Sequence, residues 1–133
     1  MCRKKSFVSV LGLNYYLSEE EWSGMLVALG QMLPTGSSLV FDFPDDAAFT
    51  PRAGERAQKQ AMLARAAGEP MRQGYSIKEM EALLRRAGFE PRLLLEPDEI
   101  TRRYFSAHNR MEPGQPITAF DNVNYCLCFR NIP

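Results

Sequence analysis

Polar and aromatic side chains directly follow an apolar run near the start of this 133-residue sequence. The run covers residues 6–13, and Asn14, Tyr15 and Tyr16 come next. Ligands in open α/β sheets bind beyond the carboxyl ends of the strands, and amide or phenol groups there can orient an oxygen atom. The structural alternative is that the two tyrosines pack against the start of the next helix. Both interpretations stay open.

Further candidate side chains for substrate binding come later in the chain. Asp42 ends a second apolar run, where it either lines a substrate site or ends its strand in water, and we favour the second interpretation. Four further candidates fall in or near expected loops, on which substrate lids are often built: Arg72, Arg103, Tyr104 and His108. A lone histidine is more often a surface residue than a base. No side chain is a convincing general base, so the catalytic residues stay unassigned.

The cysteines allow two interpretations. Cys126 and Cys128 alternate with apolar residues, so we expect both on one face of a strand, and a C-x-C pair can bind metal. Only His108 is available to join them, however, so structural thiols are favoured and no metal site is expected. An odd number of cysteines without regular spacing argues against a disulfide framework and fits a reducing cytoplasm.

The overall composition excludes several classes of partner. Sixteen basic residues balance sixteen acidic ones, so bulk charge attracts neither nucleic acid nor an anionic membrane surface. No apolar run approaches the roughly 20 residues that span a bilayer. At this length and with 45% apolar residues, one domain is the default. We therefore expect a cytoplasmic protein without nucleic-acid or membrane partners.

Apolar periodicity predicts alternating strands and helices. We expect strands at 6–13, 38–43, 89–95 and 122–130, and helices at 18–33, 51–67, 76–87 and 97–105. The first strand is apolar at nearly every position, so both of its faces should be covered. A polar loop is expected over 106–116. Because this loop replaces a crossover helix, the last strand can insert antiparallel to its neighbours.

Three stretches resemble the leucine-carboxyl-methyltransferase-like family of class I S-adenosylmethionine-dependent methyltransferases, in its polyketide O-methyltransferase type. They are Ser9–Glu20 (SVLGLNYYLSEE), Leu33–Phe43 (LPTGSSLVFDF), and the pair Arg103–Phe105 (RYF) with Ala119–Tyr125 (AFDNVNY). The spacing of Gly-Glu-Pro at 68–70, Gly-Tyr-Ser at 74–76 and Ala-Gly-Phe at 87–89 also resembles the family. The order and spacing of these phrases carry the resemblance, which covers most of the chain.

The resemblance implies an α/β fold that is the C-terminal half of a class I methyltransferase sheet. The complete Rossmann-like sheet has seven strands in the order 3-2-1-4-5-7-6, so this chain would supply strands 4-5-7-6, the last of them antiparallel, with flanking helices. Residues 1–133 would form a single partial domain that lacks the N-terminal cofactor-binding half. The sequence has no G-x-G-x-x-G turn to approach the cofactor closely. Weak or no S-adenosylmethionine binding is therefore expected.

The resemblance also assigns site residues. Leu11, Gly12 and Leu13 would border the methionine part of the cofactor, and Asn14, Tyr15 and Tyr16 would lie near the methyl acceptor. Human-type members have a glutamate about where Leu11 stands, which counts against a protein phosphatase as substrate. Methyl transfer to a carboxylate needs little help from a general base, because the nucleophile is already ionised. Methyl transfer to a phenol requires a general base or a hydrogen-bond acceptor.

Two hypotheses of different classes follow. In the first, the chain is a fragment of an O-methyltransferase that acts on a small-molecule or carboxylate acceptor, and it is inactive alone. In the second, it is a non-catalytic α/β module that dimerises, or complements a separate N-terminal half, through residues 6–13. An exposed apolar edge strand is a template for such association.

Overall fold

The computed structural model describes residues 4–68 and 73–131. Its elements, in chain order, are β1 (Phe7–Val10), η1 (Asn14–Tyr16), α1 (Glu19–Met32), β2 (Ser38–Pro44), α2 (Glu55–Ala66), α3 (Ile77–Arg86), β3 (Phe89–Leu95), α4 (Pro97–Ile100), η2 (Thr101–Phe105), α5 (Ser106–Met111) and β4 (Val123–Arg130). The fold is mixed α/β. No helix among these residues is long and apolar enough to cross a bilayer.

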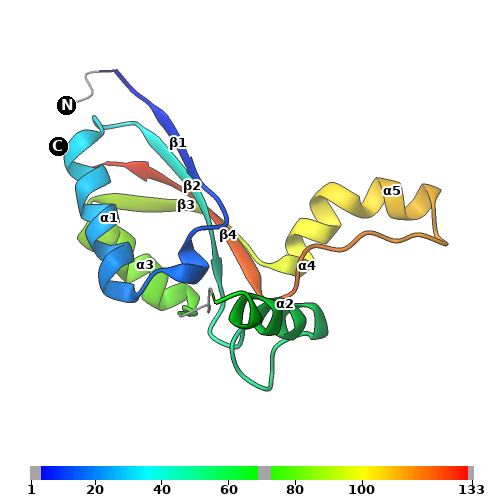
Figure 1. Cartoon of the computed structure of the whole chain (residues 1–133). Coiled ribbons are helices and arrows are strands. Elements are labelled where there is room, and N and C mark those ends of the chain that lie inside the picture. The colour runs from blue at the N-terminus through cyan, green and yellow to red at the C-terminus, as the bar shows by residue number, and fades with distance from the viewer. Residues whose placement is uncertain (1–3, 69–72, 132–133) are drawn as a thin grey trace.

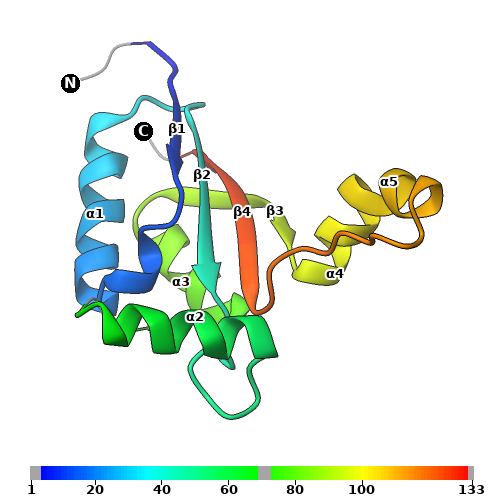
Figure 2. The ribbon, with the colours of Figure 1, turned by 45° about the vertical axis from the view of Figure 1, so that its right-hand side comes forward.

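The strands form one sheet in the order β1-β2-β4-β3 (Figure 2). β1 runs parallel to β2, whereas β4 runs antiparallel to both of its neighbours. The carboxyl ends of β1, β2 and β3 therefore lie at one end of the sheet, and β4 begins there. The strand that is reached through a long connection is thus the antiparallel one, as its connection allows.

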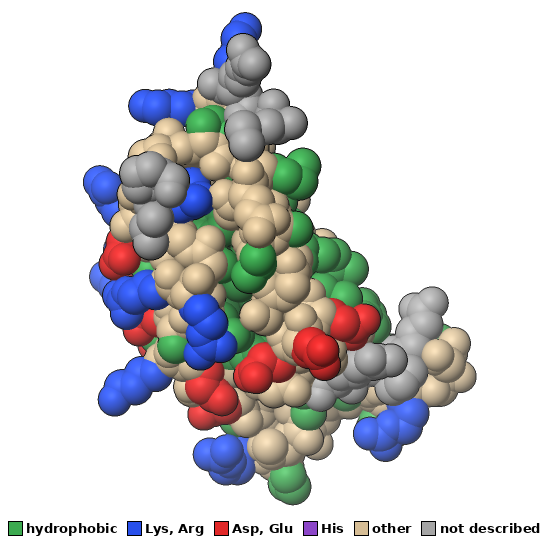
Figure 3. All heavy atoms as spheres, turned by 90° about the vertical axis from the view of Figure 1, so that its left-hand side faces the viewer, with side chains coloured by type: hydrophobic (Ala, Val, Ile, Leu, Met, Phe, Trp, Pro, Cys, Tyr) green, Lys and Arg blue, Asp and Glu red, His purple; other side chains and the backbone are tan. Residues whose placement is uncertain are grey.

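Helices α1 and α3 cover one face of the sheet (Figure 1). Trp22 of α1 packs on Phe41 of β2 with their ring centroids 4.9 Å apart, and its indole N–H donates to the Met80 sulfur of α3 at 3.2 Å. All three side chains are fully buried. On the outside of this layer, Lys, Arg, Asp and Glu side chains face the solvent (Figure 3). The hydrophobic core therefore lies between the sheet and this pair of helices.

The predicted helix starts are confirmed at α1 and α3. Ser18 and Glu21 form a reciprocal capping box, as do Ser76 and Glu79, and each pair satisfies two backbone N–H groups that the helix leaves free. Gly88 ends α3 at a φ of 91°, which is the left-handed conformation that glycine adopts without strain. These local signals place the two covering helices correctly.

The prediction that both faces of the first strand are covered is wrong. β1 is four residues long, and its Val8 and Val10 pack against the core. The side chain of Phe7, which alternates with them, is 67% exposed. No helix of the described chain covers the face on which Phe7 lies, and the apolar composition of the strand did not reveal this.

Two helix boundaries also differ from the prediction. The helix predicted from residue 51 begins later, at Glu55, because the residues before it form a turn in which the Thr50 hydroxyl donates to the Ala47 carbonyl. Residues 106–111 form α5 instead of a loop, because the chain continues through α4 and η2 without a break. We call residues 97–118 the arm. It projects away from the sheet in both ribbon views (Figures 1 and 2).

Candidate functional site

Asp42 is the centre of a hydrogen-bonded site at the carboxyl ends of β1 and β2. One carboxylate oxygen accepts the Gly12 N–H at 2.8 Å, and the other accepts the Tyr15 hydroxyl at 3.0 Å. The residue is only 6% exposed. The interpretation that Asp42 ends its strand in water is therefore wrong. Because β1 and β2 are parallel neighbours, their carboxyl ends meet, and this brings residues 30 positions apart into contact.

Gly12 turns the chain at this point. Its φ is 73°, and apart from its two chain neighbours no described residue lies within 4 Å of the position that a Cβ would occupy. A side chain is disfavoured there by backbone conformation and not by crowding. The flanking Leu11 and Leu13 are exposed, and Asn14 begins the short helix η1, which presents Tyr15 to Asp42. The glycine thus leaves backbone open to a ligand beside the carboxylate.

The two phenols nearest Asp42 stay protonated at neutral pH. Burial, followed by the negative charge of Asp42, raises the pKa of Tyr15 far above its usual value. The same two causes raise the pKa of Tyr125, which is the cross-strand partner of Asp42. Tyr15 therefore acts as a neutral donor to the carboxylate, and no tyrosinate forms beside it.

No Lys or Arg of the described chain is ion-paired with Asp42. Its hydrogen-bond partners are a backbone N–H and a phenol, and both are neutral. A carboxylate that is removed from water is stabilised when a cation lies against it. The site is thus chemically suited to a positively charged group.

Asn14 and Tyr16, which were predicted together with Tyr15, do not contact Asp42 in the same way. Asn14 is fully buried, and within the described part of the chain its side-chain amide has no hydrogen-bond partner. The ring of Tyr16 is partly exposed and meets Tyr15 edge to face, with centroids 6.5 Å apart. The structure therefore brings Gly12, Tyr15 and Asp42 together and leaves Tyr16 at the rim.

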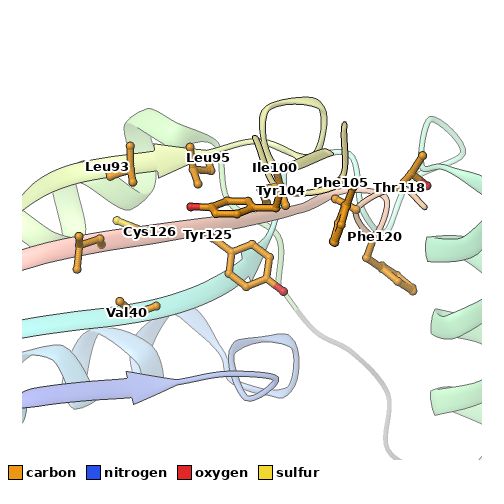
Figure 4. Close-up of a pocket in the computed structure, with 12 residues that line it drawn as sticks. Val40, Leu93, Leu95, Ile100, Tyr104, Phe105, Thr118, Phe120, Tyr125 and Cys126 are labelled. Carbon is orange, nitrogen blue, oxygen red and sulfur yellow. The ribbon is translucent and has the colours of Figure 1, made fainter. Parts of the chain in front are cut away.

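Tyr104 lies in a separate cavity of about 510 Å³ next to this site. The cavity lies between the arm and the sheet face opposite α1 and α3, and Figure 4 shows side chains from both sides pointing into it. Tyr125 lines the cavity and pairs across the strands with Asp42, so it connects the two regions. Sequence reasoning missed Tyr125, because its place opposite Asp42 depends on the register between β2 and β4, which strand direction alone does not fix.

The remaining candidates lie elsewhere. Arg72 falls outside the described residues. His108 is exposed on α5, where its Nε2 atom lies 3.2 Å from the Gln115 carbonyl oxygen and helps to shape the arm. Arg103 pairs with Glu99 on the surface of the arm. Neither residue reaches Asp42.

Cys126 and Cys128 lie on one face of β4, as predicted, and both are buried beneath the helices. The Cys128 thiol lies 3.6 Å from the Leu39 carbonyl oxygen. The hydrogen bond with Cys126 and burial raise the pKa of the Cys128 thiol well above its usual value. These are properties of core thiols in a closely packed sheet.

Known proteins share this fold over part of their length. No protein-family model matches the chain. It is 35% identical over 122 residues to YktD of Bacillus subtilis (strain 168), a candidate S-adenosyl-L-methionine-dependent methyltransferase; the match covers 91% of this chain and 38% of YktD. Solved structures of low identity include a DUF574 family protein from Streptomyces avermitilis (TM-score 0.63, 18% identity, 97% of this chain and 45% of that one). Another is an S-adenosylmethionine-dependent methyltransferase from Mesorhizobium loti, with a TM-score of 0.57 and 16% identity; the match covers 93% of this chain and 61% of that one. The chain thus spans less than two thirds of each of these proteins and has the fold of a part of the methyltransferase structure.

Proposed function

We propose that this chain is the C-terminal half of an S-adenosylmethionine-dependent O-methyltransferase of the leucine-carboxyl-methyltransferase-like type. On this proposal β1, β2, β3 and β4 correspond to strands four, five, six and seven of the complete sheet. The sheet order and the antiparallel β4 support the correspondence. The similarity to YktD and to methyltransferase structures supports the reaction class.

The observation that carries the proposal is the buried carboxylate of Asp42 at the carboxyl ends of two parallel strands. S-adenosylmethionine has a sulfonium and an ammonium group, so a buried anion with neutral donors fits it electrostatically. Gly12 would allow its backbone to approach the methionine part, and Leu11 and Leu13 would contact apolar portions. The residues present therefore fit the cofactor.

When bound, S-adenosylmethionine would supply an electrophilic methyl group on sulfur. The work of the chain would be to position an acceptor oxygen in line with that group, because orientation supplies much of the rate in such transfers. Asp42 fixes the turn at Gly12 and the ring of Tyr15 at once, so both sides of the site depend on one side chain. Tyr16 is partly exposed and stays a proposed contact of the acceptor, whereas Asn14 is fully buried and is not proposed as one.

We further propose that the 133-residue chain binds the cofactor weakly by itself. The proposed contacts come from one strand edge and one turn, whereas a nucleotide-sized ligand needs most of its surface enclosed for tight binding. A dissociation constant of about 1 mM, which corresponds to about −4.1 kcal/mol, is the tightest expected.

An NMR titration of the isotope-labelled chain with S-adenosylmethionine tests both the location of the cofactor site and its weak affinity. We expect the backbone amide signals of Gly12 and Tyr15 to shift and that of Gly88, at the opposite end of the sheet, to stay in place. Absence of shifts at Gly12 and Tyr15 at 10 mM ligand, about tenfold above that constant, would overturn the site. Micromolar affinity would leave the site standing and overturn the claim that a half is missing.

A second candidate function is a non-catalytic module that associates through β1. Phe7 is 67% exposed on a strand whose outer edge pairs with no other strand of the described chain. Pairing of residues 6–13 with the same residues of a second copy, or with a separate N-terminal half, would satisfy the free backbone groups. This candidate and the first are compatible if the complete enzyme is assembled from two chains.

A further inference from the structure

We infer that the cavity beside Asp42 binds an uncharged aromatic hydroxyl compound, and that this compound is the methyl acceptor. The inference rests on the proposed function and narrows the acceptor from a small molecule or carboxylate to a neutral phenol-like one. Four kinds of observation carry it: which face of the sheet forms the cavity floor, which rings enclose it, what charge its lining has, and where it lies relative to Asp42.

The floor of the cavity is an apolar patch on the sheet. Val40 pairs across the strands with Leu127, and Leu127 pairs with Leu93, so the three side chains point to the same face. This is the face opposite α1 and α3, where the alternate residues Leu39 and Phe41 belong to the core. An apolar ligand that covers this floor removes it from water, which is favourable.

The walls of the cavity are aromatic. Its lining includes the rings of Tyr104 and Phe105 from η2 of the arm and of Phe120 and Tyr125 from the final segment. In Figure 4 the ring of Tyr104 lies across β4, and that of Tyr125 projects beside it between β4 and β2. Flat rings gain from offset or edge contacts with other rings. The volume of about 510 Å³ is that of a small-molecule pocket.

None of the twelve described lining residues carries a charge. They are Val40, Leu93, Leu95, Ile100, Tyr104, Phe105, Thr118, Ala119, Phe120, Tyr125, Cys126 and Leu127. Arg56 lies just behind Phe120, 5.5 Å from its ring centroid, but its guanidinium is already paired with Asp121 and bonded to Thr118. A carboxylate in this cavity would lose water and gain no cation. A phenol could instead hydrogen-bond to Tyr104 or Tyr125.

The cavity and the proposed methyl-donor site meet at Tyr125. This residue lines the cavity and lies directly across from Asp42 in the β2–β4 register. Donor and acceptor sites would therefore share a wall. Asp42 is the buried carboxylate of the described chain, and on this inference it would accept a hydrogen bond from the acceptor hydroxyl, which an uncharged phenol requires and a carboxylate does not.

A matched pair of probes tests the inference on the whole chain without any cofactor. 2-Naphthol and 2-naphthoate have the same ring system, but at pH 7 only the second is charged. We expect fluorescence titration to give a dissociation constant at least tenfold lower for 2-naphthol. Equal affinities, or no binding of either probe, would overturn the inference.

Two substitutions in the arm locate the probe. Tyr104 is 62% exposed, so its replacement leaves the core intact, and Tyr104→Ala should weaken 2-naphthol binding at least fivefold. Met111→Ala removes an 81% exposed side chain from the same arm outside the cavity, and it should change the constant less than twofold. Equal effects of the two variants would place the probe elsewhere and overturn the inference.

Failure of this inference and failure of the proposed function are distinguishable. If 2-naphthol binds as expected but S-adenosylmethionine does not shift Gly12 and Tyr15, the cavity stands as an aromatic site and the methyltransferase proposal falls. If the cofactor maps to Gly12 and Tyr15 but the probes do not discriminate, only the choice of acceptor falls.

Discussion

Tyr75 shows how one side chain can be fixed by packing and still carry an energetic cost. It is fully buried against Phe43, with ring centroids 6.4 Å apart, and its hydroxyl has no hydrogen-bond partner within the described part of the chain. A buried donor without a partner costs about 1–3 kcal/mol. The ring therefore contributes packing while its oxygen contributes a penalty.

Tyr75→Phe should leave the free energy of unfolding unchanged or raise it by about 1 kcal/mol, because it removes that penalty and keeps the ring. Urea denaturation at pH 7 measures the change. Tyr104→Phe, at an exposed position, is the control for loss of a phenol oxygen and should have no effect. A loss above about 1 kcal/mol in Tyr75→Phe would mean that the hydroxyl has a real partner.

We also expect Tyr75 to make the folded protein less stable in alkali. Burial, and then the charges of Glu19 and Glu79, raise the pKa of Tyr75 to about 12, above the value of about 10 expected in the unfolded chain. As the pH rises, the Tyr75 hydroxyl therefore loses its proton in the unfolded state before it does so in the folded state. The free energy of unfolding is unaffected by this group below pH 10, and it falls as the pH rises from 10 toward 12. Each such tyrosine contributes a slope of about 1.4 kcal/mol per pH unit. Denaturation between pH 9 and 11.5 should show a shallower loss in Tyr75→Phe, and identical slopes would contradict the assignment.

At the scale of elements, the close approach of α1 and α3 depends on one glycine. A Cβ at Gly30 would overlap the backbone carbonyl oxygen of Ala87, at the end of α3. A Cβ at Gly24, six residues earlier in the same helix, would meet no described residue within 4 Å beyond the adjoining helix backbone. A side chain added at position 30 would therefore clash with α3, whereas one added at position 24 would not, although both positions hold glycine within the same helix.

Gly30→Ala should lower the free energy of unfolding by about 1–3 kcal/mol, because the two helices must move apart. Gly24→Ala should raise it by up to about 1 kcal/mol, since alanine is the better helix former. Thermal denaturation of the pair measures both changes. The packing account fails if both substitutions stabilise the protein.

Predictions from sequence succeeded for elements whose signals are local. The capping boxes at Ser18 and Ser76 and the terminal Gly88 fix α1 and α3 through contacts within a few residues. The predictions failed where the burial of a residue depends on a partner that is distant in the sequence. The burial of Asp42 depends on Gly12 and Tyr15, which meet it only once the parallel pairing of β1 and β2 is known. Site residues could be named from sequence, but their grouping could not.

At the scale of the whole molecule, the sheet is covered unevenly. α1 and α3 bury one face, and the other face carries the cavity beneath the arm and, at the β1 edge, the exposed Phe7. A two-layer domain normally buries its apolar sheet face against further elements. We therefore propose that a second copy or a complementary chain covers the β1 side in solution.

Phe7→Lys tests that association. Light scattering of the unaltered chain at tens of micromolar should show a species larger than a monomer, and the charge placed on the edge strand should shift it to monomer. Val27→Lys, at an exposed apolar position on α1, is the matched control and should not change the mass. A clean monomer for the unaltered chain would exclude pairing through residues 6–13 at that concentration.

The central claim is that the buried charge of Asp42 makes the carboxyl end of the sheet a site for a cationic methyl donor. Asp42→Asn and Asp46→Asn each remove one negative charge near the end of β2, but Asp46 is exposed. The dissociation constant of S-adenosylmethionine, followed by the Gly12 amide signal, compares them directly. We predict that Asp42→Asn weakens binding at least tenfold, about 1.4 kcal/mol, and that Asp46→Asn changes it less than twofold. Equal constants for the two variants would contradict the claim.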